Sequence, residues 1–154
     1  MLLGSSSLRV ICAAVFPVVA ACGTADLGTY EGVRDLKLDE NYYFCVVQPK
    51  VITPRRCAAG DTGDPAGGCH ASKSSMILVQ IDKPVACSAD NKPIGVPTPE
   101  ERSNYSAAQL RATRDVEGSP LLTKPTGKVD HPRTIFDTKS TEADIIRTWI
   151  RGAR

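Results

Sequence analysis

The sequence has few aromatic residues and very little net charge. Aromatic side chains make up 5% of its 154 residues, and 19 Lys and Arg face 17 Asp and Glu. The absence of a basic cluster argues against a protein that binds nucleic acid. Gly and Pro are frequent, at 12 and 11 residues, which predicts a loop-rich chain. A domain with so little aromatic mass needs a covalent cofactor, disulfides or both to hold its core.

Motifs of common enzymes are also missing. No serine stands in a G-x-S-x-G pattern, and no glycine-rich loop precedes a Lys-Ser helix start. Asp61 and Asp64 lie beside glycines, but the position-12 glutamate of a calcium-binding loop is absent. We therefore expect a protein that is not an enzyme, with neither a hydrolase site nor a phosphate loop.

Long hydrophobic runs are absent except near the N-terminus. The run from Val10 to Ala21 is 12 residues long, which is too short for a membrane-spanning helix and typical of a secretory signal. It ends in Val-Ala-Ala-Cys22, which resembles the lipobox of bacterial lipoproteins. This resemblance implies cleavage before Cys22 and acylation of that cysteine. The alternative is an ordinary signal peptide cut near Ala21, which would leave Cys22 unmodified.

These features predict the organisation of the chain. Residues 1–21 form the signal peptide, 22–38 a tether and 39–154 a single domain. The expected anchor is a lipid that holds the domain to a membrane. Gly23 takes the place of an aspartate that would favour retention in the inner membrane, so we expect the outer membrane.

Four cysteines remain in the predicted domain: Cys45, Cys57, Cys69 and Cys87. Export to an oxidising compartment makes free thiols rare. Four cysteines allow three disulfide pairings. A further arrangement uses Cys57 and Cys69 as thioether attachments for haem and joins Cys45 to Cys87. The number of cysteines does not distinguish these alternatives.

The segment CAAGDTGDPAGGCH, residues 57–70, ends like a c-type haem attachment motif. That motif is C-x-x-C-H, whereas eleven residues separate Cys57 from Cys69 here. The chain has only two histidines, His70 directly after a cysteine and His131 before a proline. A c-type haem needs one ligand beside its attachment cysteine and a second from the opposite side. The two histidines could supply both.

Local patterns predict several elements. Asp39 begins a helix whose aromatic residues follow at once, and Pro49 and Pro54 limit it. The apolar run 76–81 predicts a strand or a buried extended segment. A short helix is expected over 106–114, with its N-cap at Ser106 and Leu110 facing inward.

The most distinct element is a C-terminal helix. Ser140 or Thr141 is its expected N-cap, and Gly152 its end. Four apolar residues then share one face of the helix. They are Ile145, Ile146, Trp149 and Ile150.

The order of these elements resembles the small cytochrome c-like domains of secreted and lipid-anchored bacterial proteins. The similarity covers roughly residues 39–153, and the final W-I-R-G-A segment carries it most specifically. It implies a mostly α, loop-rich fold. It further implies that Cys57 and Cys69 attach haem, that His70 is the proximal iron ligand, and that His131 replaces the Met of a Met-Pro pair as distal ligand. The long gap after Cys57 departs from the family pattern.

The expected function is haem binding and electron transfer to redox partner proteins. Two histidine ligands would leave no open iron position, which disfavours catalysis. An alternative is a cytochrome-like module without haem, in which disulfides Cys57–Cys69 and Cys45–Cys87 stabilise the fold. A third interpretation is a metal site formed by Cys57, Cys69 and His70, although zinc sites favour shorter cysteine spacings.

Overall fold

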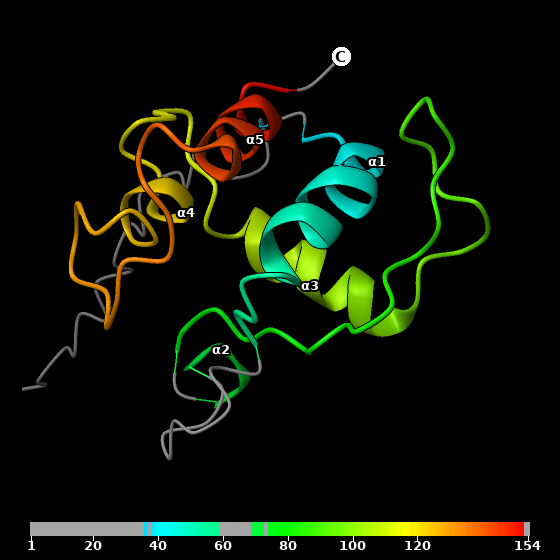
Figure 1. The fold of residues 1–154 in the computed structure, drawn as a ribbon, viewed down its shortest axis with the longest axis horizontal. Helices are drawn as coiled ribbons and strands as arrows, with labels where there is room; N and C mark the ends of the chain where they lie inside the picture. The colour runs from blue at the N-terminus through cyan, green and yellow to red at the C-terminus, as the bar shows by residue number, and fades with distance from the viewer. Residues whose placement is uncertain (1–35, 37, 59–68, 73, 153–154) are drawn as a thin grey trace, which may run out of the picture.

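The computed structural model describes residues 36, 38–58, 69–72 and 74–152 (Figure 1). Within these residues there is no strand, and Cys87 and Pro93 form an isolated antiparallel bridge. The prediction of a mostly α, loop-rich fold is therefore confirmed. The predicted signal, Cys22 and nearly all of the tether lie outside the described residues. The helices are α1 (Glu40–Tyr42), η1 (Tyr43–Ile52), α2 (Cys69–Ser72), α3 (Pro99–Gln109), α4 (Pro120–Thr123) and α5 (Thr141–Ile150).

The first helix begins as predicted but extends beyond the predicted limit. The Asp39 side chain accepts a hydrogen bond from the Tyr42 amide and caps α1. The helix then passes through Pro49 because η1 is a π-helix, in which the Thr53 amide bonds to the carbonyl of Gln48, five residues earlier. Proline lacks an amide hydrogen and conflicts with the carbonyl four residues before it in an α-helix. The wider π turn accommodates that defect.

Four aromatic side chains form the centre of the core. Tyr43 lies with its ring centroid 5.1 Å from that of Trp149 and 5.3 Å from that of Tyr105, and Phe44 packs edge-on against Tyr43. The indole Nε1 of Trp149 donates to the carbonyl of Asp39 over 3.0 Å. The last helix is thus joined to the start of the first, and Figure 1 shows α5 beside α1.

The predicted helix over 106–114 is wrong in its limits. Helix α3 begins at Pro99, and Thr98 and Glu101 form a capping box in which each side chain bonds the other's backbone amide. Proline at the first helical position favours this start, because its missing amide hydrogen would be unpaired there anyway. Leu110 follows the helix end and is 64% exposed, not buried as expected.

The apolar run 76–81 has no neighbouring strand among the residues described. Its backbone forms hydrogen bonds with the side chain of Asn104. The Asn104 carboxamide accepts a hydrogen bond from the Val79 amide at 2.7 Å and donates to the Val79 carbonyl at 2.8 Å. Leu78 is buried between the exposed Ile77 and Val79. The run therefore forms no strand, and the expected burial holds for Leu78 but is wrong for Ile77 and Val79.

The C-terminal helix agrees with the prediction. Ser140 is the N-cap, since its hydroxyl accepts from the Ala143 amide at 3.2 Å. Ile146, Trp149 and Ile150 are buried, and Ile145 is partly buried against the core. Gly152 ends the helix with φ of 78°, a left-handed conformation that favours glycine.

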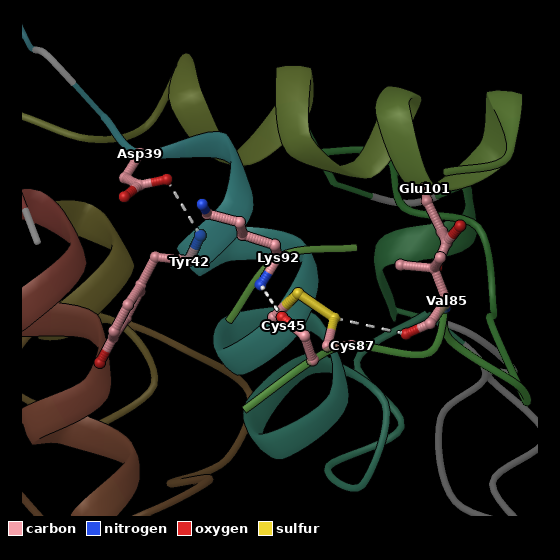
Figure 2. The surroundings of a disulfide bond; sticks show 8 residues. Asp39, Tyr42, Cys45, Val85, Cys87, Lys92 and Glu101 are labelled. Atoms are coloured by element: carbon pink, nitrogen blue, oxygen red, sulfur yellow. Dashed lines mark hydrogen bonds between the residues drawn. A yellow bond between two sulfur atoms is a disulfide. The ribbon is translucent and has the colours of Figure 1, made fainter. Parts of the chain in front are cut away.

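A disulfide joins Cys45 of η1 to Cys87 in the loop before α3, as Figure 2 shows. The haem-binding and the haem-less interpretations of the sequence both included this bond, and it is confirmed. It fixes a loop of 42 residues to the central helix.

Removing this disulfide should lower stability substantially. The double variant Cys45→Ala/Cys87→Ala frees a 42-residue loop, which gives the unfolded chain more entropy and costs about 4 kcal/mol of unfolding free energy. Urea denaturation measures the loss, with the exposed Asp90→Ala as a control expected to change stability by less than about 0.5 kcal/mol. Equal stability of the double variant and the control would contradict a structural role for this bond.

Candidate functional site

A cavity of about 570 Å³ lies beside η1, within the described part of the chain. This volume is within the range of about 300–1,000 Å³ typical of cofactor and ligand sites. Its wall is mainly apolar and comes from residues far apart in the sequence. The apolar side chains are Val51, Ile52, Met76, Leu78, Pro120, Leu121, Pro125, Pro132, Phe136 and Ile146.

Both histidines of the chain line this cavity. His70 belongs to the short helix α2, and His131 to the loop between α4 and α5. Their ring centroids are 6.1 Å apart, and their planes differ by 22°. The fold therefore brings together two side chains that are 61 residues apart in the sequence.

Backbone carbonyls orient both imidazoles. Nδ1 of His70 lies 2.9 Å from the Met76 oxygen, and Nδ1 of His131 lies 2.6 Å from the Arg133 oxygen. A carbonyl oxygen only accepts, so Nδ1 is the donor in each contact. A ring with its single hydrogen on Nδ1 has a lone pair on Nε2. Metal-binding histidines commonly have this arrangement, in which the non-ligating nitrogen donates to a carbonyl or carboxylate.

The environment of His70 favours its neutral form. Burial lowers the pKa of His70 most, and the neighbouring His131 and Lys124 lower it further, against the hydrogen bond to Met76, which raises it. The neutral imidazole is the form that binds a metal ion.

Cys57 lines the same cavity as a free thiol. Burial raises its pKa to about 11, although Arg133 and Arg55 act in the opposite direction. The thiol is therefore protonated at neutral pH. It is not part of the Cys57–Cys69 disulfide considered in the sequence. Cys69 begins α2, but its side chain lies outside the described residues.

Charged side chains also border the cavity. Among the described residues that line it, Arg111 and Lys124 are basic and Asp130 is acidic. The Arg111 guanidinium donates to the Ser75 carbonyl over 2.5 Å, which holds it beside the segment that follows α2. Neither cation was identified from the sequence, because no local pattern distinguishes Arg111 or Lys124 from the other basic residues of the chain.

Among the described residues, no group of three or more His, Cys, Asp and Glu could hold a metal ion. The predicted site of Cys57, Cys69, His70 and a further group is not tested by this, because the Cys69 side chain lies outside the described residues. None of the helices described is long and apolar enough to cross a membrane. Comparison with protein-family models, with curated proteins and with solved structures found no match.

Proposed function

We propose that the cavity binds haem and that the protein transfers electrons. The observation that carries this proposal is the pair of nearly parallel imidazoles, with centroids 6.1 Å apart. An imidazole–metal bond is about 2.0–2.1 Å, and the ligating nitrogen is about 1.1 Å from its ring centre, so two imidazoles on opposite sides of one metal have centroids about 6.3 Å apart. The observed separation is close to this value, so His70 and His131 are the residues that would hold the iron in this proposal.

The other lining residues suit the same group. The apolar wall matches a flat macrocycle, and Arg111 and Lys124 match its two carboxylates. A porphyrin supplies four nitrogen ligands itself, so two protein ligands complete the iron, and a cluster of three is unnecessary. The chain's own residues therefore meet the three chemical requirements of the group: apolar contact, anion pairing and two lone-pair nitrogens.

We assign covalent attachment to Cys57 and Cys69. The thiol of Cys57 is in the cavity, and Cys69 directly precedes the proposed ligand His70. A thioether forms when a thiol adds across a vinyl group, so the cysteine hydrogen moves to the vinyl carbon and no oxidant is consumed.

Electron transfer follows from the two protein ligands. With His70 and His131 both bound, no iron position remains for a small-molecule substrate, so the protein is not an enzyme in this proposal. Bound haem supplies one-electron redox chemistry, and the protein orients it and controls its exposure. The packing of α5 on the first helix beside this cavity supports a cytochrome c-like arrangement. We further propose a lipid anchor at Cys22 in the bacterial outer membrane, with protein redox partners.

The experiment is a pyridine haemochrome spectrum combined with the intact mass of protein exported to the periplasm. We expect the mass of one haem, and no alkylation of Cys57 or Cys69 after denaturation, because thioethers do not react. The variant Cys57→Ala should retain one thioether and shift the haemochrome band towards that of a singly attached haem. A colourless protein with a Cys57–Cys69 disulfide would reject the proposal and favour a haem-less module of the cell envelope.

A further inference from the structure

A small hydrogen-bond network surrounds Nδ1 of His70. The Ser74 hydroxyl oxygen lies 2.8 Å from this nitrogen and 2.7 Å from the Met76 carbonyl oxygen. The Met76 amide donates back to the same hydroxyl over 3.0 Å. The Leu78 amide in turn donates to the His70 carbonyl over 2.8 Å. The Ser74 hydroxyl and the Met76 carbonyl therefore lie against Nδ1, and the Leu78 amide holds the backbone of His70.

Counting donors and acceptors favours one arrangement of the hydrogens. A hydroxyl has one hydrogen, and the Met76 carbonyl is an acceptor only, so the Ser74 hydrogen points to that carbonyl. The hydroxyl oxygen then accepts from the Met76 amide and from Nδ1–H of His70. If His70 carried its hydrogen on Nε2 instead, the Ser74 hydroxyl could donate to Nδ1, but the Met76 carbonyl would then face Nδ1 at 2.9 Å and the hydroxyl oxygen at 2.7 Å with no hydrogen between them. The Nδ1–H form is the one that satisfies every group.

We propose that Ser74 is a positioning residue for His70, which it holds as the Nδ1–H tautomer so that Nε2 is available to iron. The role as iron ligand rests on the proposed function, whereas the tautomer is a property of the haem-free chain. The two histidines differ in this respect. Nδ1 of His70 contacts both the Ser74 hydroxyl and the Met76 carbonyl, whereas Nδ1 of His131 contacts the Arg133 carbonyl among the described residues.

The first test uses the haem-free protein, so its result does not depend on whether the protein binds haem. Long-range ¹⁵N–¹H NMR at neutral pH distinguishes the tautomers, and we expect His70 to be almost wholly Nδ1–H. Ser74→Ala should increase the Nε2–H fraction several-fold, because one acceptor at Nδ1 is lost. Ser74→Thr retains the hydroxyl and should restore the original tautomer, and the exposed Ser106→Ala should leave it unchanged. A wild-type His70 in the Nε2–H form would overturn the proposal.

The second test uses the haem-loaded protein. A hydrogen bond from Nδ1 makes a ligating imidazole more basic, which favours the ferric state. Ser74→Ala should therefore move the midpoint potential to a more positive value, and Ser74→Thr should return it towards that of the wild type. If both variants keep the wild-type potential and electron paramagnetic resonance spectrum, Ser74 has no positioning role. If neither the wild type nor any variant retains haem, the proposed function fails. The tautomer assignment still stands in that case, provided that NMR shows His70 in the Nδ1–H form.

Discussion

In the proposed haem complex, replacing His131 with alanine is expected to convert the ferric iron from a low-spin state to a high-spin state almost completely. The proposal assigns both iron ligands to His70 and His131, whose ring centroids are 6.1 Å apart. Removing one leaves an open position and a weaker ligand field. Absorption and electron paramagnetic resonance spectra measure the change, and added imidazole should restore the low-spin spectrum.

Two further variants, at positions 130 and 131, test whether the spectral change comes from the loss of an iron ligand. Asp130→Asn alters another cavity residue without removing a ligand, so the low-spin spectrum should persist. His131→Met introduces the residue that the resembling family has before proline, and it should remain six-coordinate with a more positive potential. A His131→Ala protein with the wild-type spectrum would exclude His131 as a ligand and would require a different residue on that side.

Replacing Trp149 with alanine is expected to lower the free energy of unfolding by about 4–6 kcal/mol. The side chain is completely buried against Tyr43 and Tyr105. Truncation of a buried Trp costs about 3–5 kcal/mol through lost burial and a residual cavity. The hydrogen bond from Nε1 to the Asp39 carbonyl adds about 1 kcal/mol. Urea denaturation of the haem-free protein measures the sum without a contribution from ligand binding.

The components of this effect can be separated with matched variants. Trp149→Phe keeps most of the ring and removes the donor to the Asp39 carbonyl, so we expect a loss of about 1–3 kcal/mol. Thr141→Ala changes an exposed residue of the same helix and should cost less than about 0.5 kcal/mol, because Ser140 is the N-cap. A Trp149→Ala protein as stable as Thr141→Ala would contradict the central place of α5 in the core.

Local chemistry explains which helix limits could be predicted. The Ser140 cap, the apolar face with Trp149 and the terminal Gly152 all act within a few residues, and each was predicted correctly. The start of α3 at Pro99 differs from the predicted N-cap at Ser106, although Thr-Pro-x-Glu at residues 98–101 is a local capping signal. The passage of η1 through Pro49 had no such signal, since packing of η1 in the core stabilises a winding that is rare in itself.

The sequence by itself determined the helical character of the chain, the C-terminal helix and the candidate chemistry of its two histidines. These depend on side-chain type and on spacing over one or two turns. Only the tertiary structure decided that His70, His131 and Cys57 share one cavity with Arg111, and that Cys45 bonds to Cys87. The physical reason is that such contacts depend on how α5, η1 and the loops pack, and no short-range periodicity encodes a distance between residues 61 positions apart.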